Sequence, residues 1–122
     1  MIAVIFEAEP REGQDERYLA IAASMRKAVG EVEGFVSVER YRSLSDPGRI
    51  LSLSFFEDEE AVARWRTLAS HRAAQRQGRE TVFGDYRLRI AEVLRDYGMD
   101  DRAQAPRDSR AAHARPAGNE RP

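Results

Sequence analysis

The chain has 122 residues, enough for one compact domain and too few for two ordinary ones. It contains no cysteine, which excludes disulfides, thiolate nucleophiles and cysteine-held metal clusters. Its 20 basic and 21 acidic residues leave a formal charge of −1, so we expect neither nucleic acid nor an anionic membrane surface as a partner. The N-terminal apolar run, residues 1–6, is too short for a membrane span or a signal sequence, and we expect a cytoplasmic protein.

The first half of the chain alternates between patterns typical of strands and of helices. Residues 2–9 alternate in hydrophobicity and predict a strand. Residues 13–29 carry apolar side chains at helical spacing and predict a helix. Residues 35–42 and 50–56 predict two strands, joined as a hairpin by the Pro- and Gly-containing turn at residues 45–48.

The second half adds one more helix and one more strand. Asp58, followed by two glutamates, is expected to cap a helix whose apolar stripe extends to Ala69. Alternation returns at about residues 86–94, which predict the last strand. The order βαββαβ, with right-handed crossovers, predicts an α+β fold of the ferredoxin-like type, a four-stranded antiparallel sheet with both helices on one face.

The composition changes near Gly98, which divides the chain into two parts. From Met99 onward there is no Val, Ile, Leu, Phe, Tyr or Trp. Such a segment buries too little apolar surface to offset its ordering entropy. We therefore expect a domain at residues 1–98 and a flexible polar tail, or an arm that wraps a partner, at residues 99–122.

Both faces of the predicted strands carry apolar side chains. Ile5, for example, points away from Val4 and Phe6. The helices cover only one face, so we expect the other to pack on the sheet of a second copy and form a homodimer.

The second helix would bury charge if it continued without interruption. Three arginines beyond its stripe would lie on the same face as Trp65: Arg72, Arg76 and Arg79. Unpaired guanidinium groups in a core are costly. The sequence therefore indicates either a break near Ser70, with a second segment ending at Gly78, or a stripe that ends at a wet cavity, and we favour the break. Trp65 and His71 would then lie on either side of a bend, which predicts a pocket.

Three segments, in this order, resemble the antibiotic biosynthesis monooxygenase superfamily: GFVSVERY at 34–41, LSLSFF at 51–56 and WRTLASHR at 65–72. The resemblance implies a dimeric α/β barrel with a ligand cavity between sheet and helices in each subunit. Members oxidise aromatic polyketides with oxygen and without metal or flavin, or bind and degrade haem. Members often have an asparagine beside the tryptophan, whereas the only asparagine here is Asn119.

The candidate site residues follow from these patterns. His71, the only histidine of the predicted domain, suits a general base or an axial haem ligand, and is otherwise a partly exposed helix residue; one histidine does not make a typical zinc site, so we expect no metal. Arg87 either holds a phenolate or carboxylate in the pocket or pairs with glutamates on the sheet. Four aromatic residues either line a cavity for a small hydrophobic ligand or pack in the core: Trp65, Phe6, Tyr41 and Tyr86.

We therefore predict a cofactor-independent monooxygenase that acts on a small planar aromatic or quinol-type molecule. His71 would remove the phenolic proton, Arg87 would hold the anion, and Trp65 and Phe6 would stack on the ring. Two alternatives stay open: a non-catalytic dimer that binds a small apolar ligand, and a haem-binding or haem-degrading protein.

Overall fold

A computed structural model describes residues 1–114, except for the side chains of Ala69 and Ser70. The chain divides into two compact units, one covering Met1–Glu92 and one that begins at Val93. The first unit contains these elements, in chain order: β1 (Ile2–Pro10), α1 (Asp15–Gly30), β2 (Phe35–Arg42), β3 (Ile50–Phe56), α2 (Glu59–Thr67), α3 (Ala69–Gln77), the π-helical turn η1 (Gly78–Val82) and β4 (Phe83–Glu92).

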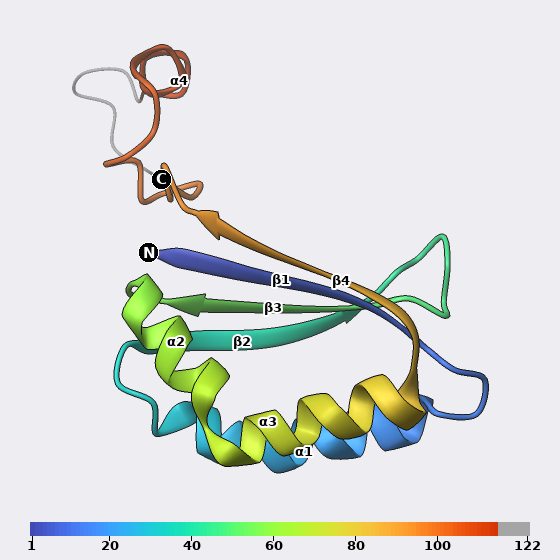
Figure 1. The fold of residues 1–122 in the computed structure, drawn as a ribbon. Coiled ribbons are helices and arrows are strands. Elements are labelled where there is room, and N and C mark those ends of the chain that lie inside the picture. Colours follow the sequence, from blue (N-terminus) through green and yellow to red (C-terminus); the bar gives the residue numbers. More distant parts are fainter. Residues whose placement is uncertain (115–122) are drawn as a thin grey trace. The chain divides into compact units, whose positions relative to one another are not determined.

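The four strands form one antiparallel sheet in the order β2-β3-β1-β4. The helices α1, α2 and α3 lie together on one side of this sheet (Figure 1). This is the predicted ferredoxin-like α+β fold. The other face of the sheet carries no helix of the first unit.

Alternation along the strands decides which side chains face the helices. On β1, Ile2 and Ala8 are buried on the helix side, and they pair across the sheet with Phe56 and Ile50 of β3. Phe56 is fully buried, and it anchors one core cluster with α2. A second cluster joins Tyr18 of α1 to Ile50 and Val82. The region between these two clusters is where the cavity described below opens.

The predicted helix break exists, but it lies two residues earlier than expected. Leu68 has an extended backbone (φ −61°, ψ 136°) and separates α2 from α3. The hydroxyl of Thr67 donates to the carbonyl oxygen of Ala63 at 2.7 Å, within the last turn of α2. Ser70 is therefore not the break point, since α3 has already begun at Ala69.

The last strand also differs in its limits from the prediction. It begins at Phe83, three residues before Tyr86, and ends at Glu92. The early start follows from the turn η1, which leads directly into the strand, and from the pairing of Phe83 with Pro10.

The second unit contains the short helix α4 (Arg107–Ala112). Within it the Arg102 guanidinium lies 5.1 Å from the ring centroid of Tyr97 and donates to the carbonyl oxygen of Gly98 at 3.0 Å. The expected flexible tail at residues 99–122 thus includes one helix, and its last eight residues lie outside the described part. Its mobility and its role as a partner-wrapping arm stay predictions. None of the helices within residues 1–114 has the length and hydrophobicity needed to traverse a lipid bilayer.

Candidate functional site

A cavity of about 480 Å³ lies between the sheet and the helices of the first unit. Its walls come from all four strands, from α1, α2 and α3, and from η1. Most of the lining is aliphatic or aromatic, as is usual for sites that bind small molecules. Ten of the lining residues have polar side chains: Tyr18, Arg40, Ser52, Ser54, Arg66, His71, Arg72, Gln75, Arg79 and Tyr86.

The floor of the cavity is built from paired rows of the sheet. One row runs Arg40, Ser52, Phe6 and Leu88, each residue opposite the next on neighbouring strands. The row beside it runs Val38, Ser54, Val4 and Ile90. Ser52 and Ser54 on the central strand β3 have small side chains, which leave space between the sheet and the helices.

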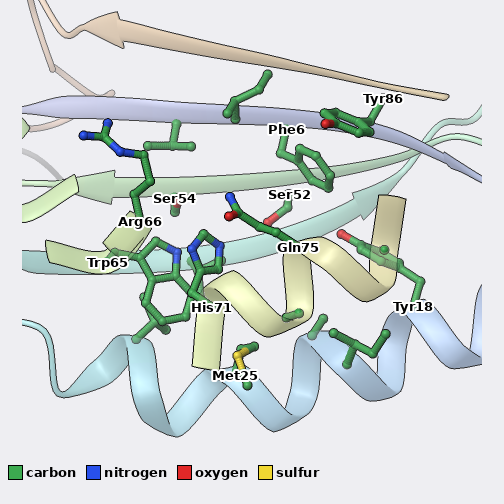
Figure 2. A pocket seen from close by; sticks show the side chains of 18 of the residues that line it. Phe6, Tyr18, Met25, Ser52, Ser54, Trp65, Arg66, His71, Gln75 and Tyr86 are labelled. Carbon is green, nitrogen blue, oxygen red and sulfur yellow. The ribbon is translucent and has the colours of Figure 1, made fainter. Parts of the chain in front are cut away.

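The bend at Leu68 forms one end of the cavity. Asp58 caps α2 by accepting a hydrogen bond from the Ala61 amide at 2.8 Å. The chain then turns at Leu68, and the rings of Trp65 and His71 stack across the bend with centroids 4.2 Å apart and planes 25° apart. Figure 2 shows this pair at one end of the cavity, with the Gln75 side chain reaching toward the sheet beside it.

The surroundings of His71 keep its ring neutral. Burial lowers the pKa of His71, and the nearby backbone carbonyls of Arg66 and Trp65 oppose this to a smaller extent. Its Nδ1 atom is buried and has no hydrogen-bond partner among the described residues. His71 lines the cavity, and a neutral imidazole in this position can accept a proton from a bound molecule.

The other end of the cavity is aromatic. The ring of Phe6 lies 5.4 Å from that of Phe83 and 5.5 Å from that of Tyr86. Tyr18 packs on Phe83 with a centroid distance of 5.5 Å. Arg79 donates a hydrogen bond to the Tyr86 hydroxyl and lies 5.8 Å from the centre of its ring. The cavity therefore has two different ends, one formed by Trp65 and His71 and the other by a cluster of aromatic rings (Figure 2).

Four of the six predicted site residues line this cavity, and two do not. Trp65, His71, Phe6 and Tyr86 are brought together. Arg87 follows Tyr86 on β4, so its side chain points to the opposite face of the sheet, where its partner on β1 is Glu7. Tyr41 follows Arg40 on β2. Because Arg40 faces the cavity, the side chain of Tyr41 points to the opposite face of the sheet, as that of Arg87 does.

The expected role of Arg87 as the group that holds an anion in the pocket is therefore corrected. The alternative, an ion-paired strand face, matches its surroundings better, since Arg89 on the same face contacts Glu7 at 3.1 Å. Sequence reasoning missed Arg40 and Phe83. Arg40 could have been found from strand alternation, because it lies two residues after Val38 and so shares its face.

Comparison with known proteins adds a family and a fold. The family model described as antibiotic biosynthesis monooxygenase matches residues 1–77. The jasmonate monooxygenase ABM of Pyricularia oryzae is 50% identical over 93 residues, which are 76% of this chain and 43% of that protein. The chain thus spans less than half the length of this relative. The uncharacterised protein YqjZ of Bacillus subtilis is 32% identical over 93 residues, covering 76% of this chain and 79% of that protein.

Among solved structures, Rv0793 from Mycobacterium tuberculosis superimposes with a TM-score of 0.72 and 18% identity. The match covers 80% of this chain and 98% of that one. At this identity the likeness supports the ferredoxin-like fold and nothing further.

Proposed function

Since the chain belongs to the antibiotic biosynthesis monooxygenase family, we propose that it is a cofactor-independent monooxygenase for a small planar aromatic or quinol-type molecule bound in the cavity. The observation that carries this proposal is the stacked Trp65–His71 pair, which lies on the wall of an apolar cavity and includes a histidine whose pKa is lowered by burial. A relative that shares half of its matched residues with this chain is named a monooxygenase, which supports the reaction class.

The proposed chemistry begins with a proton transfer. His71 accepts the proton of a phenol or enol, and the resulting anion is electron-rich enough to reduce dioxygen without a metal or flavin. In an anthrone-type substrate a methylene carbon is oxidised to a carbonyl: one oxygen atom of O₂ stays on the carbon, and the other leaves as water with the two methylene hydrogens. In a quinol-type substrate one oxygen atom replaces a ring hydrogen as a hydroxyl group, and the other leaves as water with the two hydrogens that the quinol loses on becoming a quinone. Trp65 and Phe6 supply flat apolar surfaces that hold the ring near His71.

The sheet face that is turned away from α1, α2 and α3 supports a homodimer as the working form. It carries a half-buried apolar strip on β1 and β3: Ile5, Leu51, Leu53 and Phe55. Tyr41 stands next to this strip with 50% of its surface exposed. A face of this kind is suited to packing against an identical sheet. Light scattering on the purified protein measures the oligomeric state directly, and a stable monomer would contradict this part of the proposal.

The test of activity is turnover of anthrone-like and quinol substrates, measured as oxygen consumption and as product formation. We expect His71→Ala to lower the rate by about 100-fold or more, in line with the usual contribution of a general base. His113→Ala is a matched control, because His113 is the only other histidine and does not line the cavity. Equal background rates for wild type and His71→Ala would refute the proposed chemistry.

The two alternatives predict different results in the same experiments. A binding protein without activity would show ligand-dependent melting shifts and no product. A haem protein would give a Soret band on addition of hemin, and His71→Ala would abolish this band.

A further inference from the structure

The charged side chains of the cavity are all of one sign. Within the part of the chain that the structure describes, no Asp or Glu lines the cavity, whereas four arginines do: Arg40, Arg66, Arg72 and Arg79. None of the four forms an ion pair in residues 1–114. Other arginines of the same unit are paired, such as Arg42 with Asp15 at 3.3 Å. Guanidinium groups without a protein carboxylate favour an anionic group on the ligand.

Arg40 differs from the other three arginines in its surroundings. Those three are exposed to solvent, and Arg79 already donates to the Tyr86 hydroxyl. Arg40 is half-buried on β2, faces the helices and pairs across the sheet with Ser52. Its Nε atom is buried and has no hydrogen-bond partner among the described residues. Arg40 lines the cavity and has no carboxylate partner among the described residues, so the charge of its guanidinium group is available to pair with a bound anion.

The hydroxyl group of Tyr18 lies beside Arg40. Tyr18 is buried in α1, and Figure 2 shows its oxygen directed into the cavity. Burial raises the pKa of Tyr18, while the charge of Arg40 and a hydrogen bond with it oppose this rise. The phenol therefore stays protonated at neutral pH, and its O–H can be donated to an acceptor.

We propose that the ligand of this cavity carries a carboxylate, and that Arg40 and Tyr18 bind it at the aromatic end. The apolar body of the ligand then extends over Phe6 toward Trp65 and His71 at the other end. This inference rests on the proposed function in one respect, the use of this cavity for a small, largely apolar molecule. It adds the charge of that molecule and the direction in which it lies.

The donor set fits a carboxylate better than a phosphate. One guanidinium fork and one hydroxyl match the acceptor positions of two coplanar oxygens. A phosphate group carries more charge than the one half-buried guanidinium of Arg40 neutralises. The arginine also gives specificity, because a neutral ligand would leave the half-buried charge of Arg40 without a counter-charge.

The test compares two ligands of nearly equal shape, 4-butylbenzoic acid and 4-butylbenzamide. Trp65 is the only tryptophan and lines the cavity, so its fluorescence reports binding, and calorimetry gives an independent affinity. We expect the acid to bind wild type at least tenfold more tightly than the amide at pH 7. In Arg40→Gln this preference should fall to about threefold or less, the remainder coming from the other three arginines, with the amide affinity unchanged within twofold. Tyr18→Phe should weaken the acid several-fold and leave the amide nearly unaffected.

Arg42→Gln is the matched control. Arg42 stands on the same strand, is paired with Asp15 and does not line the cavity, so the preference for the acid should persist. If Arg40→Gln fails to fold by circular dichroism, the acid-to-amide ratio in wild type and in Tyr18→Phe still decides the matter. Equal affinities in wild type, no binding of either ligand, or an undiminished preference in Arg40→Gln would overturn the proposal.

The outcome is separable from that of the proposed function. Preference for the acid without turnover of any substrate would uphold the carboxylate site and contradict the oxygenase. Turnover that depends on His71, with no preference for the acid, would do the reverse.

Discussion

Replacing Gly78 with alanine should destabilise the domain, although alanine is the better helix former. Gly78 is buried where α3 passes into η1, and its backbone is helical (φ −59°, ψ −49°). A Cβ atom there would lie 2.6 Å from Cε2 and 3.0 Å from Cδ2 of Phe83. The ring of Phe83 packs on Tyr18 and Phe6, so it can yield only by displacing these rings or by entering the cavity.

Two opposing contributions set the size of the effect. Alanine in place of glycine inside a helix gains up to about 1 kcal/mol. Inserting a methyl group against the Phe83 ring, which must then shift from its contacts with Tyr18 and Phe6, costs about 1–3 kcal/mol. The expected net loss is therefore about 1 kcal/mol, which corresponds to a decrease in Tm of about 4–8 °C for a domain of this size.

Gly30→Ala provides the matched comparison. Gly30 is the last residue of α1, its φ is not positive, and a Cβ atom there would meet nothing within 4 Å. Gly30→Ala should therefore raise the free energy of unfolding by about 0.4–1 kcal/mol, with no steric cost to oppose it. Urea unfolding of both variants measures the difference, and the m-value shows whether the two-state assumption holds. If Gly78→Ala is as stable as Gly30→Ala, the close contact with Phe83 does not constrain this site and the reasoning is refuted.

Three other changes test the local energetics. Asp58→Ala removes the cap that accepts from the Ala61 amide, and it should cost about 1 kcal/mol in thermal unfolding, whereas Asp58→Asn should cost little. Burial lowers the pKa of His71 in the folded state, so the unfolded chain binds a proton at this histidine first as the pH falls. The free energy of unfolding should therefore be at its full value above about pH 6.5 and decrease below it. His71→Gln should make the free energy of unfolding, measured with urea, depend less on pH in this range. Arg89→Gln removes an exposed ion pair with Glu7, and it should change the unfolding free energy of the isolated subunit by less than about 1 kcal/mol at 0.15 M salt.

The fold was predictable because its signals are local. The alternation of residues 2–9 and 50–56, and the helical spacing from Asp15 to Val29, depend only on near neighbours in the sequence. The start of β4 was less accessible. Residues 78–82 form a π-helical turn, which has no simple periodic signature, and the strand then begins at Phe83 because it pairs with Pro10, a residue far away in the sequence.

The site was predictable in part, for the same physical reason. Trp65 and His71 lie six residues apart, so a single bend is enough to bring their rings together. Arg87 was misplaced because its prediction depended on the charge of its side chain, which says nothing about the side of the sheet; strand alternation already puts Tyr86 and Arg87 on opposite faces. Arg40 and Tyr18 belong to different elements, and their neighbourhood exists only after α1 has packed on β2.

The two explanations offered by the sequence for the arginines after Trp65 turn out to be complementary. Arg72 and Arg79 line the cavity from α3 and η1, and both are exposed, so their charged heads remain hydrated while their methylene groups cover apolar surface. A larger side chain that filled the space beneath them would exclude water from these guanidinium groups and add a desolvation cost without a partner to offset it. The arginines therefore oppose a solid core at this position, and the break at Leu68 lets the chain carry them around the rim of the cavity.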